Sequence, residues 1–210
     1  MYCLRGRKDA NQFAFSKPSA PALPAPEPIM PLCCFQVDKR GGYQRRLQLE
    51  QRLEDWLDSN KPTQAFVLWG LGGSGKSTLA RTFAARLAED DGTASIRIIF
   101  LLSVVKIDQD YVGLLEKLRD ASGQYEKVSG GQYANVRQDA PKSLSQTEVR
   151  DKVHQLLASP LFKGKWLCVL DDLPAPAEQA MEEAGLDWIR EGFPWAHGRT
   201  VITTRSAEWV

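Results

Sequence analysis

The chain has 210 residues, with 27 lysines and arginines against 26 aspartates and glutamates, and a formal net charge of +1. This length suits one α/β domain, or most of one. The balanced charge gives no electrostatic reason to expect a nucleic-acid partner. No run approaches the about 18 apolar residues that a membrane helix needs. We therefore expect a cytoplasmic chain that binds neither nucleic acid nor membrane.

The cysteine pattern points to a reducing compartment. None of the four has the spacing of a zinc site or a redox motif; they are Cys3, Cys33, Cys34 and Cys168. A disulfide framework is not expected, which favours an intracellular setting. Cys168 lies in an apolar run and is expected to be a small buried hydrophobic residue.

Residues 1–34 read as a disordered leader, and residues 35–210 as the folded domain. The segment "SKPSAPALPAPEPIMP" holds six of the twelve prolines and little that could build a core. Its spaced prolines favour an extended, semi-stiff tether. A ligand for a proline-binding module is the alternative interpretation.

From residue 43 onward, helical and strand patterns alternate. Apolar, β-branched runs predict strands at residues 65–69, 94–105, 165–172 and 199–205. Amphipathic patterns predict helices at residues 43–60, 76–90, 110–120, 145–159 and, after a linker, within 174–192. Ser145 and Glu148 form a capping box, and residues 121–140 are expected to be an irregular loop. This alternation predicts a parallel sheet of about four strands with helices on both faces.

The segment "GLGGSGKST", Gly70–Thr78, fits the pattern G-x-x-x-x-G-K-[ST] between a predicted strand and a predicted helix. Glycines let the backbone curl round a phosphate, and the helix N-terminus presents free N–H groups to it. Lys76 can reach the β- and γ-phosphates, and the Ser77 hydroxyl can ligate Mg²⁺. The expected nucleotide contacts are Gly70, Gly72, Gly73, Ser74, Gly75, Lys76, Ser77 and Thr78.

The predicted strand in "LCVLDDL" ends in two carboxylates. Asp171 is expected to hold Mg²⁺ through water, and Asp172 to orient or deprotonate an attacking water. Many strands end in acidic residues for structural reasons alone, which is the alternative.

The segment "GRTVITTR" ends in Thr203, Thr204 and Arg205. Arg205 can pair with the γ-phosphate as a charged fork and so sense its presence. The alternative is a threonine-rich strand with Arg205 on the surface. His154 and His197 have no partners that suggest a metal site or a catalytic triad, and the tryptophans are interpreted as packing residues.

Together these three motifs resemble the NB-ARC group of STAND-type signal-transduction ATPases. The resemblance covers about residues 35–210 and implies a P-loop NTPase fold, a three-layer sandwich. It also implies that the Thr-Thr-Arg strand lies between the glycine-rich-loop strand and the aspartate strand. An ADP-bound resting state, an ATP-bound active state, slow hydrolysis and oligomerisation on activation are further implications.

The sequence also departs from the family pattern. The upstream Gly-Arg motif that holds adenine is matched only loosely by "FQVDKRGG", through Val37 and Arg40. The family's fifth strand, helical region and winged-helix region have no counterpart before Val210. We therefore expect a truncated domain in which the strand before the glycine-rich loop lies at an unpaired edge.

The leading hypothesis is an ATP/ADP-binding switch with slow Mg²⁺-dependent hydrolysis, in which Lys76 and Asp172 are catalytic. One alternative is a non-catalytic truncated protein that pairs with its own copies or with full-length relatives. Another is a small-molecule kinase, which needs an acceptor site and a lid that is often rich in arginine. The 121–140 segment carries only Arg137, so this alternative is weaker.

Overall fold

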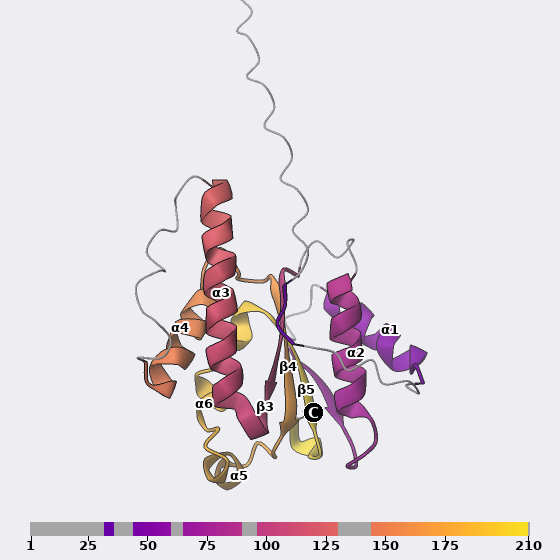
Figure 1. Ribbon diagram of the computed structural model, residues 1–210. Helices are drawn as coiled ribbons and strands as arrows, with labels where there is room; N and C mark the ends of the chain where they lie inside the picture. The colour runs from indigo at the N-terminus through magenta and orange to yellow at the C-terminus, as the bar shows by residue number, and fades with distance from the viewer. Residues whose placement is uncertain (1–31, 36–43, 60–64, 90–95, 130–143, 210) are drawn as a thin grey trace, which may run out of the picture.

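The computed structural model describes residues 32–35, 44–59, 65–89, 96–129 and 144–209 (Figure 1). These form an α/β structure around one parallel sheet, as predicted. Its strands are β1 (Leu32–Cys33), β2 (Ala65–Trp69), β3 (Ile98–Ser103), β4 (Trp166–Leu173) and β5 (Arg199–Thr204). Their order across the sheet is β1-β3-β4-β5-β2.

Helices cover both faces of the sheet. Figure 1 shows α1 (Leu47–Asp58) and α2 (Lys76–Glu89) on one side, and α3 (Ile107–Ser129) and α4 (Gln146–Ala158) on the other. The side chains of successive strand residues alternate between the two faces. Cys168 therefore packs in the cluster under α3 and α4, and its neighbour Val169 packs in the cluster under α1 and α2. Cys168 is fully buried, as expected.

The strand order brings the candidate motifs to one edge of the sheet. β5 lies between β2 and β4, which is the order that the resemblance implies. Trp69, at the end of β2, is in register with Thr204 of β5. Because all strands are parallel, the glycine-rich loop, the aspartate pair and the Thr-Thr-Arg segment follow the same ends of three neighbouring strands. Within the described residues β2 pairs with β5 alone and is an edge strand, as expected.

The sheet has one strand more than the four expected. β1 pairs in parallel with β3, with Leu32 opposite Ile98 and Cys33 opposite Ile99. The end of the expected leader thus belongs to the sheet, while residues 1–31 lie outside the described residues. Two residues are too few for a sequence pattern, and their extended conformation comes from pairing with β3.

The third helix is also longer than expected. Residues 121–129 continue α3 to Ser129, where a loop was predicted; residues 130–143 lie outside the described residues. Gly and Ser lower helix propensity, yet the Ser122 hydroxyl donates to the Leu118 carbonyl at 2.7 Å and Ser122 is buried. Ala121 also packs against the core cluster under α3 and α4, so burial of these two residues outweighs local propensity here.

Two further local predictions, the capping box at Ser145 and a helix within residues 174–192, agree with the structure, except that the second region forms two short helices. The capping box at the start of α4 forms as predicted: the Ser145 amide donates to Glu148 and the Glu148 amide donates to Ser145. The 174–192 region forms two short helices, α5 (Glu178–Glu183) and α6 (Trp188–Glu191). Single turns of 3-10 helix lie at Val104–Lys106, Trp195–His197 and Ala207–Trp209.

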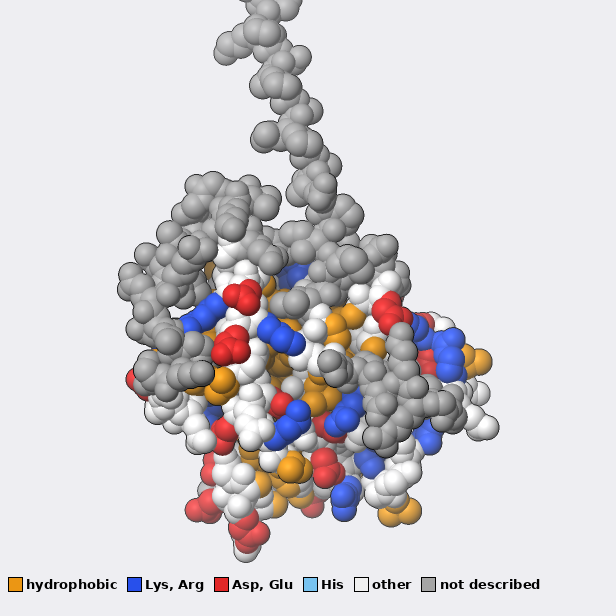
Figure 2. All heavy atoms as spheres, in the orientation of Figure 1, with side chains coloured by type: hydrophobic (Ala, Val, Ile, Leu, Met, Phe, Trp, Pro, Cys, Tyr) orange, Lys and Arg blue, Asp and Glu red, His pale blue; other side chains and the backbone are white. Residues whose placement is uncertain are grey.

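The surface agrees with the balanced composition. On the face shown in Figure 2, basic and acidic side chains of the described residues lie interspersed, without an extended area of one sign. One tryptophan departs from the packing interpretation: Trp69 is 57% exposed on the edge strand, whereas Trp166 is fully buried.

Candidate functional site

The glycine-rich loop joins β2 to α2 within six residues. Gly70, Gly73 and Gly75 have φ angles of 148°, 74° and 82°. Side-chain-bearing residues rarely adopt these conformations, which explains glycine at the three positions. The loop ends at Lys76, the first residue of a 14-residue helix whose N-terminus carries free backbone N–H groups. Thr78 lies in the first turn of this helix and is exposed.

Lys76 lies against the loop that it follows. Its Nζ donates to the carbonyl oxygens of Gly70 and Leu71, each at 2.8 Å, and lies 3.4 Å from the Ser74 hydroxyl. One ammonium group thus bridges the start and the middle of the loop. The same group can neutralise an anion that the loop and the helix N-terminus bind.

Asp171 is the buried member of the aspartate pair, at 5% exposure. The Thr203 hydroxyl donates to its Oδ1 at 2.7 Å, and Arg81 Nη2 donates to its Oδ2 at 2.6 Å. Burial raises the pKa of Asp171, but hydrogen bonds from Ser77 and Thr203 and the Arg81 charge outweigh burial and lower it overall. The carboxylate is therefore ionised at neutral pH, and the predicted residues Ser77, Asp171 and Thr203 lie together.

Asp172 is exposed where its neighbour Asp171 is buried, and it lies where the pairing of β4 with β5 shifts register, between Leu170 and Leu173. Its φ is +62°. The Asp172 amide donates to the Thr203 hydroxyl at 2.9 Å, so this hydroxyl joins both aspartates. The side chain of Asp172 is half exposed.

Arg205 links the Thr-Thr-Arg segment to the other two motifs. Its Nε lies 3.5 Å from Asp172 Oδ1, and a Cβ built on Gly72 would lie 3.9 Å from its Cζ. A pocket of about 510 Å³ opens beside the pair. It is lined by Asp172, Leu173, Pro174, Ala175, Arg205 and Ser206. An exposed arginine, a carboxylate and the glycine-rich loop therefore share one rim of the sheet.

The oxygen donors near the loop suit Mg²⁺ better than a transition metal. Within the described residues, no group of three or more His, Cys, Asp or Glu is placed to hold a metal. Mg²⁺ is usually held by one or two protein oxygens together with substrate phosphates. A single carboxylate, Asp171, hydrogen-bonded to the Ser77 hydroxyl, fits that requirement.

Sequence reasoning missed two arginines of this site. Arg46, just before α1, donates from Nη2 to the Ser74 carbonyl at 2.5 Å, and Nη2 lies 3.4 Å from where a Gly75 Cβ would be. Arg81 pairs with Asp171. Their partners are 28 and 90 residues away in the sequence, so no local pattern could have identified them. The predicted adenine-motif residues Val37 and Arg40 lie outside the described residues.

Within the described part of the chain, no helix has both the length and the apolarity to cross a membrane. No curated protein matches the chain. Residues 44–205 match the family described as Nephrocystin 3, N-terminal, and this match includes the glycine-rich loop, both aspartates and Arg205. The matching family is thus not the NB-ARC family that the three motifs resemble. The match spans most of the sequence, and the chain belongs to the Nephrocystin 3, N-terminal family.

Proposed function

We propose that this chain binds ATP and ADP with Mg²⁺ and acts as a cytoplasmic signal-transduction switch that hydrolyses ATP slowly. The observation that carries the proposal is the convergence of three elements at one sheet edge. A glycine loop with three positive φ angles opens a long helix, Lys76 lies against that loop, and Asp171 with Thr203 lies beside it. We assign the fold on the same ground to the STAND-type P-loop NTPases.

Each group has a role in this proposal. Loop N–H groups and Lys76 bind the β- and γ-phosphates, after Lys76 exchanges loop carbonyls for phosphate oxygens. Ser77 and Asp171 would hold Mg²⁺, which supplies charge neutralisation on the phosphates when bound. Asp172 orients the attacking water, and Arg205 pairs with the γ-phosphate. Oligomerisation on activation remains an implication of the resemblance.

The first test is nucleotide affinity with and without the loop lysine. Lys76→Ala removes the ammonium that faces the phosphates, and we expect ADP and ATP affinity in the presence of Mg²⁺ to fall at least about a hundredfold, as for loss of a charge-assisted contact in a preorganised site. Isothermal titration calorimetry of the purified chain measures both. Lys163→Ala, at an exposed position away from the site, is the matched control.

Two outcomes would oppose the proposal. If wild type and Lys76→Ala both fail to bind either nucleotide, the switch function is wrong and the non-catalytic interaction protein is favoured. If wild type binds ATP and turns it over at the rate of a metabolic enzyme once an acceptor is added, the kinase alternative is favoured.

A further inference from the structure

The ion pair between Arg81 and Asp171 joins α2 to β4 inside the candidate site. Arg81 lies five residues after Lys76 on the same helix, and its Nη2 is 2.6 Å from Asp171 Oδ2. The Asp171 side chain is 6% exposed and that of Arg81 is 43% exposed. The arginine therefore reaches from the surface to a carboxylate that solvent barely contacts.

The protein's own donors already hold both oxygens of this carboxylate. Thr203 donates to Oδ1 and Arg81 donates to Oδ2. Arg81 Nε is buried and has no hydrogen-bond partner among the described residues. The guanidinium is thus bound to Asp171 through one nitrogen while a second buried donor is left unsatisfied, which weakens the hold of this arginine on its position.

A metal held by Asp171, directly or through water, would meet the positive charge of Arg81 at close range. Buried like charges repel more strongly than charges in water, because the local dielectric constant is lower. Oδ2 would also divide its negative charge between the guanidinium and the metal shell, which weakens both contacts. Arg205 does not create the same conflict, since its contact with the half-exposed Asp172 is longer, at 3.5 Å.

We propose that Arg81 is a positioning residue that pairs with Asp171 and must leave it when the metal–nucleotide complex binds. This inference rests on the proposed function. Arg81 thereby competes with Mg²⁺ for the buried carboxylate and raises the Mg²⁺ concentration that half-saturates the site. Its exposed side allows the freed guanidinium to turn into solvent.

The first test is the Mg²⁺ dependence of ADP binding, followed with a fluorescent ADP analogue. In Arg81→Gln we expect the half-saturating Mg²⁺ concentration to fall roughly tenfold, the scale of one lost charge-assisted hydrogen bond. Affinity for ADP without metal should stay within about twofold, since Arg81 contacts Asp171 and not the loop. The half-saturating Mg²⁺ concentration of Arg81→Lys should lie between those of wild type and Arg81→Gln. Arg52→Gln, which changes an exposed charge on α1, should have the wild-type value.

The second test is thermal unfolding with and without Mg²⁺–ADP. If Arg81 leaves Asp171 on binding, Arg81→Gln should lower the Tm of the free chain more than that of the complex. If Arg81→Gln lowers the Tm of the free chain and of the complex equally, the Arg81–Asp171 pair persists on binding and the inference is wrong. An unchanged or higher Mg²⁺ requirement in Arg81→Gln also overturns it. If Arg81→Gln does not fold, the same two measurements on Arg81→Lys decide.

These results separate the two proposals. Wild-type binding of ADP together with an unchanged Mg²⁺ requirement in the Arg81 variants overturns only the role of Arg81. Absence of wild-type binding at every Mg²⁺ concentration overturns the proposed function, and the inference falls with it.

Discussion

At the scale of single residues, Asp171 and Asp172 are adjacent in sequence but occupy opposite environments. Asp171 is buried and held by Thr203 and Arg81, whereas Asp172 is half exposed beside a pocket. Asp172 is the one non-glycine residue of the described part with a positive φ, +62°. Such a conformation costs about 1–3 kcal/mol and is common at functional sites. The exposed carboxylate therefore lies at a strained backbone position.

Asp172→Ala should therefore spare nucleotide binding and slow hydrolysis, by about a hundredfold if the carboxylate acts as a general base. Single-turnover release of phosphate from bound ATP measures the rate, and calorimetry checks the affinity. Asp172→Asn is the matched variant, because asparagine tolerates a positive φ but cannot take a proton. Hydrolysis at the wild-type rate in both variants would remove Asp172 from the mechanism.

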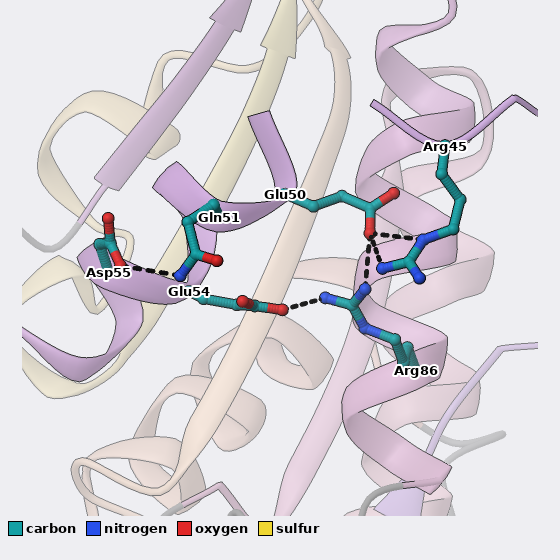
Figure 3. A network of polar contacts seen from close by, with 6 residues as sticks. All are labelled: Arg45, Glu50, Gln51, Glu54, Asp55 and Arg86. Atoms are coloured by element: carbon teal, nitrogen blue, oxygen red, sulfur yellow. Dashed lines mark hydrogen bonds and ion pairs between the residues drawn. The ribbon is translucent and has the colours of Figure 1, made fainter. Parts of the chain in front are cut away.

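At the scale of elements, α1 is joined to α2 by a network of charges (Figure 3). Glu50 of α1 is 3% exposed and accepts from Arg45 at 2.6 Å and from Arg86 of α2 at 2.5 Å. Arg86 also pairs with Glu54, one turn further along α1. This network fixes the start of α1 next to α2, where the adjacent Arg46 reaches the glycine-rich loop.

Glu50→Gln leaves two arginines without their shared carboxylate and should lower the free energy of unfolding by about 2 kcal/mol at pH 7, a value reduced for the partly exposed arginines. Hydrogen bonding from Arg45 lowers the pKa of Glu50. The stabilisation is therefore present above the ordinary glutamate pKa and is lost as pH falls through the lowered value.

Urea unfolding at a series of pH values from 7 down to 3 measures this effect. The difference in the free energy of unfolding between wild type and Glu50→Gln should shrink as the pH falls toward 3. Glu191→Gln, at an exposed position on α6, should unfold with the wild-type free energy throughout. A gap that stays constant with pH would mean that the charge of Glu50 does not stabilise the α1–α2 contact.

At the scale of the whole molecule, the layer under α3 and α4 adds a second acid-sensitive contact. His154 of α4 lies 2.8 Å through Nε2 from the Tyr111 hydroxyl of α3, and its ring packs against Trp188 and Phe193. Burial, with a smaller effect of the Arg150 charge, lowers the pKa of His154 to about 4. The folded chain therefore keeps this imidazole neutral.

Overall stability should consequently fall in two stages on acidification. Between about pH 6.5 and 4 the unfolded chain binds a proton at His154 that the folded chain does not, at a cost of about 3 kcal/mol at most. The Glu50 contribution begins to fall near the ordinary glutamate pKa of 4.5, at the lower end of this range, and falls further below it. In His154→Gln the free energy of unfolding should depend less on pH between about pH 6.5 and 4, as measured by urea unfolding from pH 7.5 to 4. An unchanged slope would show that another group titrates there.

The sequence by itself determined what depends on near neighbours in the chain. Apolar, β-branched runs located β2 to β5, and amphipathic patterns located four main helices. The capping box predicted the start of α4, and glycine spacing predicted the loop. Parallel pairing followed from that alternation, since parallel strands need crossover connections. These patterns involve residues close together in the chain, so they can be recognised from the sequence alone.

Only the tertiary structure decided what depends on distant partners. β1 exists because β3 pairs with it, and α3 continues to Ser129 against its local propensity. The positions of Arg46 and Arg81 follow from contacts across 28 and 90 residues. The two aspartates of opposite exposure lie at a register shift between β4 and β5. Long-range pairing, not residue type, therefore determines which charges surround the glycine-rich loop.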